Sequence, residues 1–293
     1  MNLHVCLLGF GEAGQILGTD MASRGLSVCA WDVQFARASS QPSQAIAHCG
    51  KVRTARDAQD AVHAANVIIC AVTAEQTLAA ARAIAPSLPP DSYFVDLNSV
   101  SPGVKQQAAR IVHAGQGRYV EAAVMSAFPA KRLAVPMYLG GPHAAGFLGI
   151  AQALGFTGAV VFADQIGPAA AAKMCRSIII KGMEALILES MLTARHYSVD
   201  QFVLESLADL LPAPDWPALS HYMISRAMLH GRRRSEEMNE ACRTVKAAQL
   251  VPIMSSAIAQ RQAWAAEHSM VAKQDTLQQL LDAVRQRIAG TQV

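Results

Sequence analysis

The stretch Leu8-Gly9-Phe10-Gly11-Glu12-Ala13-Gly14 decides the fold of this 293-residue chain. Before it, residues 3–8 form a short apolar run, which is typical of a strand buried on both faces of a parallel sheet. After it, residues 15–24 have a helical pattern that Gly25 ends, and residues 26–32 form a second apolar run. A glycine-rich turn between a strand and a helix, inside a unit of about 30 residues, predicts a β-α-β unit at the start of an α/β domain.

The three glycines of this turn have separate physical roles. Gly9 permits the tight turn, Gly11 lets the backbone approach a pyrophosphate, and Gly14 lets the helix pack closely against the strand. Free amide groups at a helix start and the helix dipole both favour an anion there. The turn therefore predicts a dinucleotide-binding site, and its backbone contacts are expected to include the intervening residues as well: Phe10, Glu12 and Ala13.

Asp32 lies at the end of the second predicted strand. A carboxylate at this position accepts hydrogen bonds from the adenosine ribose and repels a 2′-phosphate, which favours NAD over NADP. Arg37 lies in the following loop and could hold such a phosphate, so NADP stays open as the alternative.

Strands and helices alternate up to residue 164. Two later strands are predicted at residues 67–72 and 93–97, and in an open parallel sheet ligands gather beyond the carboxyl ends of the strands. The cofactor edge should therefore also include Val72, Thr73 and Asn98.

The pattern changes to helices and turns after residue 164. We expect an α/β Rossmann-type dinucleotide-binding domain at residues 1–164, followed by an all-α domain for substrate binding and dimerisation at residues 165–293. In the second domain, Arg232-Arg233-Arg234 is interpreted as a solvated helix start with Glu236 and Glu237 as partners.

Composition and charge exclude several classes of protein. Hydrophobic residues make up 52% of the chain and charged residues 16%, which fits a globular protein with a large core. A net charge of +3 without a basic tract argues against nucleic acid as a partner. The six cysteines are scattered singly, which predicts no metal site and a reducing compartment, the cytoplasm. Neither a signal peptide nor a membrane span is expected, because the first apolar run is short and residues 178–192 are interrupted by charges.

The longest helical pattern begins at Gly167 and Pro168 and runs to Arg195. Proline suits a first helical position, because the amide it lacks would be unpaired there anyway. A helix of about 30 residues spans about 45 Å, which is long enough to join two domains. One side of this apolar helix carries a polar stripe: Lys173, Arg176, Ser177, Lys181 and Glu184.

The chain resembles the β-hydroxyacid dehydrogenase superfamily, which includes 3-hydroxyisobutyrate dehydrogenase-like proteins and has a Rossmann domain of the 6-phosphogluconate dehydrogenase type. The resemblance covers nearly the whole chain, and four segments carry it: residues 9–14, Asp96-Leu97-Asn98-Ser99, Val124-Met125-Ser126, and residues 167–173. It implies that Lys173 is the catalytic general acid/base and that the loop at residues 125–127 binds the substrate carboxylate through Ser126.

Two departures from the family pattern concern the substrate. Ser177 stands where the family usually has an asparagine, and Ala127 and Phe128 replace glycines after the serine of the substrate loop. The sequence around Lys173 resembles a poorly characterised branch of the superfamily. The identity of the acid, the direction of the reaction and any decarboxylation therefore stay open.

The chemistry can also be argued from the residues. Oxidising an alcohol by hydride transfer needs a group that takes the hydroxyl proton, and a lysine does so when burial and a like charge lower its pKa. Arg176 lies one turn from Lys173, and Ser126, Arg176 and Ser177 are candidates for binding a carboxylate. We expect an NAD(P)-dependent oxidoreductase acting on the CH–OH group of a small anionic hydroxy acid.

Two other functions stay open at this point. Imine reductases share the architecture but generally lack the lysine, and a non-catalytic nucleotide-binding regulator is suggested only by Ser177. The helical half has more apolar faces than a small domain can bury, which predicts a homodimer through that half.

Overall fold

The computed structural model describes residues 3–210, 212 and 215–290. The first two residues of the first predicted domain and the last three of the second lie outside this description. The chain forms two compact units, Met1–Lys173 and Met174–Val293. The boundary falls inside one continuous helix, α8 (Pro168–His196).

The first unit contains one eight-stranded sheet with the strand order β3-β2-β1-β4-β5-β6-β7-β8. Neighbouring strands are parallel except for β6 and β7, which pair antiparallel. The order reverses between β1 and β4, which is the point where ligands bind in open α/β sheets. The strands are β1 (His4–Leu8), β2 (Ser27–Trp31), β3 (Val52–Thr54), β4 (Val67–Cys70), β5 (Tyr93–Asp96), β6 (Arg118–Val124), β7 (Met137–Gly140) and β8 (Ala159–Ala163).

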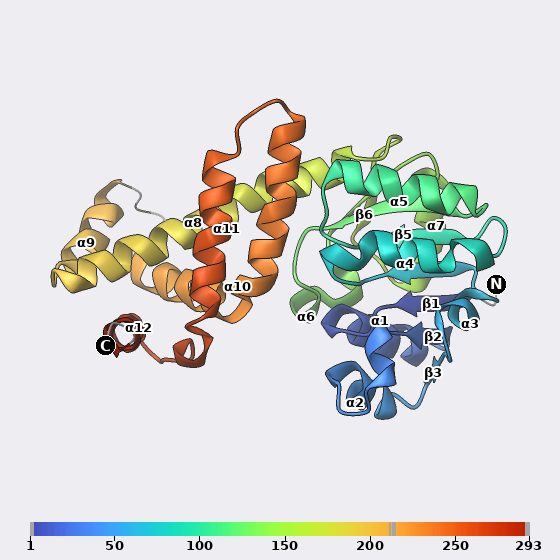
Figure 1. The fold of residues 1–293 in the computed structure, drawn as a ribbon, viewed down its shortest axis with the longest axis horizontal. Coiled ribbons are helices and arrows are strands. Elements are labelled where there is room, and N and C mark those ends of the chain that lie inside the picture. Colours follow the sequence, from blue (N-terminus) through green and yellow to red (C-terminus); the bar gives the residue numbers. More distant parts are fainter. Residues whose placement is uncertain (1–2, 211, 213–214, 291–293) are drawn as a thin grey trace. The chain divides into compact units, whose positions relative to one another are not determined.

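Helices cover both faces of the sheet, and α4 and α5 are seen together on one face in Figure 1. Side chains of β1 alternate between the faces: Val5 and Leu7 join the core under α1, α6 and α7, while Cys6 and Leu8 join the core under α3, α4 and α5. The α-helices are α1 (Glu12–Ser23), α2 (Gln41–Ala47), α3 (Ala58–Val62), α4 (Thr77–Ile84), α5 (Pro102–Ala114), α6 (Phe128–Lys131) and α7 (Ala144–Leu154). The 3₁₀ helices are η1 (Val33–Ala36), η2 (Ala74–Gln76), η3 (Ala85–Ser87) and η4 (Arg132–Ala134).

The sequence pattern predicts no element between residues 33 and 66, where the structure has η1, α2, β3 and α3. These elements are only three to seven residues long, which is too short to carry a clear apolar period. The caps of the two short helices are the better signal. Ser40 accepts a hydrogen bond from the Ser43 amide at the start of α2, and Asp57 accepts one from the Asp60 amide at the start of α3.

The second unit is helical and has its own cores. An α/β domain followed by a helical region is thus confirmed. Besides most of α8, the described helices are α9 (Asp200–Leu210), α10 (Trp216–Ala247), α11 (Ile253–Ala266), η5 (Ser269–Val271) and α12 (Leu277–Gly290).

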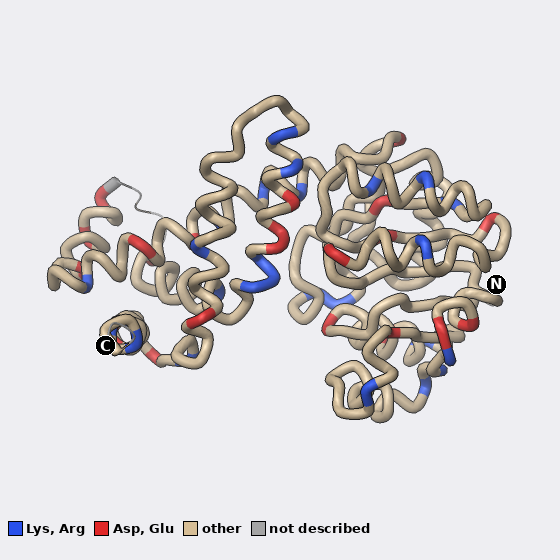
Figure 2. The backbone as a smooth tube through the Cα atoms, viewed as in Figure 1, with Lys and Arg blue, Asp and Glu red and all other residues tan. Residues whose placement is uncertain are grey.

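The prediction that a helix starts at Arg232-Arg233-Arg234 is wrong, because these residues lie in the middle of α10. Arg234 is 6% exposed and forms an ion pair with Glu184 of α8. Lys181, also buried, forms a 2.9 Å ion pair from its Nζ to Oε2 of Glu237, and burial lowers the pKa of Lys181. This part of the polar stripe is therefore an internal network between α8 and α10 of the helical unit. Figure 2 shows basic and acidic residues close together in this unit.

None of the described helices combines the length and the apolar character that crossing a membrane requires.

Candidate functional site

The glycine turn has the geometry that its sequence requires. Gly9 has φ +95°, and a Cβ at this position would lie 2.4 Å from the carbonyl oxygen of Ala71. A Cβ at Gly14 would lie 2.2 Å from the Gly9 carbonyl oxygen, so this glycine is needed for the helix to pack on the turn. Gly11 differs, because no atom lies within 4 Å of a Cβ built there. Of the three glycines in this turn, Gly11 is therefore the one whose backbone has open space beside it for a ligand.

The amino end of α1 fits an anion. The helix begins directly after Gly11, and no side chain caps it. Its first amides therefore point toward the open space beside Gly11 and are available to a pyrophosphate. The Phe10 side chain is fully buried and lies against Phe35, with ring centroids 6.0 Å apart, so Phe10 can contribute only its backbone to a ligand.

Asp32 follows β2 directly and orders the two turns around it. Its Oδ2 accepts a 2.8 Å hydrogen bond from the Phe10 amide, and its Oδ1 accepts a 2.8 Å hydrogen bond from the Gln34 amide. Each carboxylate oxygen has a second lone pair that can accept a ribose hydroxyl. The sequence missed this second role, in which Asp32 ties the glycine turn to the end of β2. Arg37 is exposed at the end of η1.

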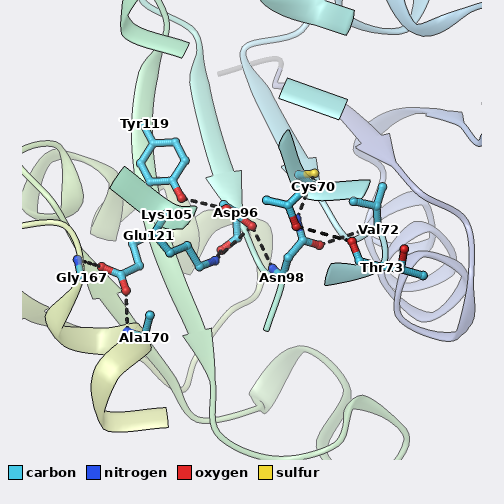
Figure 3. Close-up of polar contacts among 11 residues, drawn as sticks. Cys70, Val72, Thr73, Asp96, Asn98, Lys105, Tyr119, Glu121, Gly167 and Ala170 are labelled. Carbon is cyan, nitrogen blue, oxygen red and sulfur yellow. Dashed lines mark hydrogen bonds and ion pairs between the residues drawn. The ribbon is translucent and has the colours of Figure 1, made fainter. Parts of the chain in front are cut away.

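The ends of β4 and β5 are joined by the Asn98 side chain, which is 5% exposed (Figure 3). Its Oδ1 accepts a 2.8 Å hydrogen bond from the Val72 amide, and its Nδ2 donates to Sγ of Cys70 at 3.3 Å. Burial raises the pKa of Cys70 to about 12, so this sulfur stays a neutral thiol. The structure therefore brings Val72 and Asn98 together, with the exposed Thr73 next to them, and Asn98 acts on the edge by fixing the Val72 backbone.

Beneath this edge lies a buried polar cluster that sequence reasoning did not find. Lys105 Nζ lies 3.0 Å from Oδ1 of Asp96 and donates a 2.8 Å hydrogen bond to the Asp96 carbonyl oxygen. The Tyr119 hydroxyl donates a 2.7 Å hydrogen bond to Oδ2 of Asp96, and burial raises the pKa of Tyr119. Oδ1 of Asp96 also accepts from the Asn98 amide at 2.9 Å. The cluster fixes β5, β6 and α5 to one another and to the cofactor edge.

Glu121 of β6 connects the sheet to the first turn of α8. Its Oε2 accepts a hydrogen bond from the Gly167 amide at 2.6 Å, and its Oε1 accepts one from the Ala170 amide at 2.5 Å. The only hint in the sequence is that Glu121 is a charged residue inside an apolar strand.

The predicted catalytic and substrate residues lie in two places. Ser126 is exposed in the loop between β6 and α6, and Lys173 is half-buried in the second turn of α8; both belong to the first unit. Arg176 and Ser177 follow Lys173 by one turn of α8 and belong to the second unit. The Arg176 side chain is exposed, whereas Ser177 is buried at 8% exposure.

Comparison with known proteins shows the same two parts. Residues 4–163 match the NAD binding domain of 6-phosphogluconate dehydrogenase, and residues 194–265 match a domain of unknown function (DUF1932). A conserved hypothetical protein from Sinorhizobium meliloti 1021 is 30% identical, with 98% of this chain and 97% of that chain covered and a TM-score of 0.75. An uncharacterised 28.5 kDa protein of Methanothermus fervidus is 24% identical over 253 residues, which are 86% of this chain and 94% of that protein.

A third similar protein has an assigned activity. The 3-hydroxyisobutyrate dehydrogenase of Mycobacterium tuberculosis, whose structure was solved with L-serine, is 16% identical, with 97% of this chain and 100% of that chain covered and a TM-score of 0.73. At this identity the likeness shows the fold alone. The family model shows more than the fold, because it matches more than half of the chain. The predicted resemblance is therefore confirmed: the chain carries a nicotinamide-dinucleotide-binding domain and belongs to the family of the NAD binding domain of 6-phosphogluconate dehydrogenase.

Proposed function

We propose that this oxidoreductase transfers a hydride between NAD and the carbinol carbon of a small anionic hydroxy acid, with Lys173 as the general acid/base. In this proposal residues 1–164 bind the dinucleotide, and residues 165–293 contribute to substrate binding and dimerisation.

The placement of Lys173 supports the proposal most directly. α8 starts directly after Gly167, whose amide is bound to Glu121 of β6, so the beginning of this helix is fixed to the dinucleotide-binding sheet. Lys173 lies in the second turn of the helix, within the same compact unit as the glycine turn. Ala169 and Ala170 are buried, whereas Ala171 and Ala172 next to Lys173 are partly exposed, and their small side chains would let a flat ring approach the helix.

The dinucleotide, when bound, supplies a nicotinamide ring that accepts or returns the hydride. The chain supplies the proton chemistry: neutral Lys173 takes the hydroxyl proton as the C–H bond breaks, and its ammonium form returns a proton to the carbonyl oxygen in the reverse direction. In the same proposal Ser126, Arg176 and Ser177 bind the substrate carboxylate, Arg176 by paired N–H donors.

The residues that would hold the dinucleotide follow from the geometry of the turn. The amides at the start of α1 would bind the pyrophosphate beside Gly11, and Asp32 at the end of β2 would accept the ribose hydroxyls. The Asp32 carboxylate would repel a 2′-phosphate, so we propose NAD rather than NADP, with Arg37 as the residue that could reverse this preference.

The helical unit supports a homodimer as part of the proposal. Large apolar side chains stand exposed on its α8 and α9, namely Ile179, Leu186 and Phe202. Burying them in a second copy of this surface would remove apolar area from water. Sedimentation at micromolar concentration should show a dimer, and a monomer at that concentration would contradict this part of the proposal.

The test of the catalytic proposal is Lys173→Met, which keeps most of the side-chain length but removes the proton acceptor. A panel of small hydroxy acids is screened with NAD and with NADP by nicotinamide absorbance, and the best substrate is then used for kinetics. Because general acid/base catalysis contributes about 10²- to 10⁴-fold, kcat should fall by at least about 100-fold. The dissociation constant for NAD, measured by nucleotide fluorescence, should stay within about twofold of the wild-type value.

Lys246→Met is the matched control, because Lys246 is an exposed lysine in the last turn of α10 and should be replaceable without loss of rate. Unchanged kcat in Lys173→Met would overturn the assigned mechanism. A wild-type protein that binds NAD but oxidises or reduces no member of the panel would favour the regulator instead.

A further inference from the structure

One buried carboxylate holds the first turn of α8. The Gly167 amide and the Ala170 amide both donate to Glu121, at 2.6 Å and 2.5 Å, and the two bonds go to different carboxylate oxygens (Figure 3). In an ordinary capping box these two amides are satisfied by two side chains from the helix itself. Gly167 has no side chain and has φ +126°, so α8 cannot cap itself in this way. Glu121 of β6 alone accepts the hydrogen bonds that two capping side chains would otherwise accept.

The position of this carboxylate is closely defined. Glu121 is fully buried and faces Gly140 of the neighbouring strand β7. A Cβ at Gly140 would lie 2.7 Å from Oε2 of Glu121, so only glycine leaves room for the carboxylate there. The side chain therefore has little freedom to follow α8 if the helix start moves, and α8 is held to the sheet.

We propose that Glu121 is a positioning residue for Lys173: it sets Lys173 in place through the amino end of α8, and its charge there raises the pH at which Lys173 passes from its ammonium form to its neutral form. The inference rests on the proposed function, because it assigns a task to the residue that we propose as acid/base.

The geometric part of the argument follows from helix dimensions. Lys173 comes three residues after Ala170, which is a rise of about 4.5 Å and a rotation of about 300°. If the first turn of α8 re-formed one residue later, Lys173 would turn by about 100° relative to the sheet. The two bonds to Glu121 prevent this slip, because they fix two amides of the same turn to one strand.

The electrostatic part concerns charge at the helix start. The amino end of α8 carries a partial positive charge, which disfavours an ammonium group in the following turn. The Glu121 carboxylate offsets that charge. The other titratable groups around it are Lys105 of α5, Asp96 of β5 and Tyr119 of β6, and Lys105 and Asp96 form an ion pair with each other. Burial raises the pKa of Glu121, while Lys105 and the two donated amides act in the opposite direction.

The test is Glu121→Gln in the full-length protein, with a readout that needs no substrate. Acetic anhydride acetylates only neutral lysine, so its rate at Lys173, followed by peptide mass spectrometry across pH, gives the pH of half-maximal reactivity. Removing the negative charge should lower this pH by about half to one unit, since a helix dipole contributes about 1 kcal/mol to a charge in its first turns. Hydrogen exchange of the Gly167 and Ala170 amides should accelerate at the same time.

Three control variants separate the geometric role from the electrostatic one. Glu121→Asp keeps the charge but is too short to reach both amides, so exchange should accelerate while the pH of half-maximal reactivity stays near the wild-type value. Gly140→Ala keeps the carboxylate and displaces it, so it should also accelerate amide exchange. Asp57→Asn removes a carboxylate from the start of α3, which packs on β1 and β2, and should leave Lys173 unchanged.

An unchanged Lys173 profile in Glu121→Gln would overturn the inference, even if the amides exchanged faster, because a merely structural cap predicts that combination. The same profile change in Asp57→Asn would overturn it too. Failure of the proposed function is recognised separately, since it appears as unchanged kcat in Lys173→Met, whereas the acetylation profile of Lys173 does not depend on turnover.

Discussion

The amino ends of α1 and α8 solve the same physical problem in opposite ways. Each helix begins directly after a glycine, and each presents amides that no helical carbonyl can satisfy. At α1 no side chain caps the amides, and no atom lies within 4 Å of a Cβ built at Gly11. At α8 the Glu121 carboxylate fills the corresponding place and accepts from two amides. The anion-binding position is open at the start of α1, whereas Glu121 occupies it at the start of α8.

The difference teaches that a helix start by itself does not define a ligand site. Backbone amides and the helix dipole favour negative charge at both positions. What separates them is whether a strand nearby supplies a carboxylate. β6 supplies Glu121 to α8, whereas the carboxylate of Asp32 at the end of β2 binds the Phe10 and Gln34 amides and leaves the first turn of α1 free.

The largest effect is expected from closing the open helix start. Gly11 has φ −72° and ψ −160°, which any residue can adopt, so Gly11→Asp places a carboxylate at the cap position of α1 without strain. That carboxylate competes for the amides and repels a pyrophosphate. We expect the dissociation constant for NAD to rise by at least about 100-fold, or about 2.7 kcal/mol, while the melting temperature stays equal or rises slightly. Titration calorimetry and thermal unfolding measure the two quantities.

A control for this change is Gly149→Asp, which makes the same substitution at an exposed glycine of α7 that also has open space around it. It should bind NAD as the wild type does. Wild-type affinity in Gly11→Asp itself would mean that the pyrophosphate lies elsewhere, and the contrast between α1 and α8 would lose its functional meaning.

The sequence predicted where α1 and α8 begin and that the start of α1 is open to an anion, but not that Glu121 occupies the start of α8. The reason is physical. The glycine turn, its strand and its helix lie within about 30 residues, so local spacing carries the information. Glu121 is 46 and 49 residues from its two partners, and nothing local tells which amides a lone acid in an apolar strand will meet. The expected solvated role holds for Arg232 and for Arg233, which pairs with Glu237, but not for Arg234, because its partner lies on another helix.

The predicted residues at the cofactor edge illustrate a second limit. Strand ends and their order place Val72, Thr73 and Asn98 at one edge of the sheet. The spacing does not tell where a side chain points, and Asn98 turns inward to Val72 and Cys70. Sequence periodicity predicts which residues lie at the edge of the sheet. The orientation of each side chain there depends on hydrogen-bond partners that only folding brings close.

The smallest effect is expected in the stability of Glu121→Gln, and it sharpens the contrast between the two helix starts. Because the pKa of Glu121 is raised in the folded protein, its carboxyl group binds a proton more tightly in the folded chain than in the unfolded one. The stabilisation that results is present below the unfolded value of about 4.3 and is lost as the pH rises through the folded value. Glutamine does not titrate, so the stability advantage of wild type over Glu121→Gln in urea unfolding should shrink as the pH rises above the unfolded value. If Glu121→Gln and wild type have nearly the same free energy of unfolding at neutral pH, the Glu121 carboxylate contributes its charge more than it contributes stability. That is what we expect of a positioning residue for Lys173. If the stability advantage of wild type instead grows with pH, the ionised carboxylate is mainly a structural cap. The starts of α1 and α8 would then differ only in whether a carboxylate of the protein binds their amides.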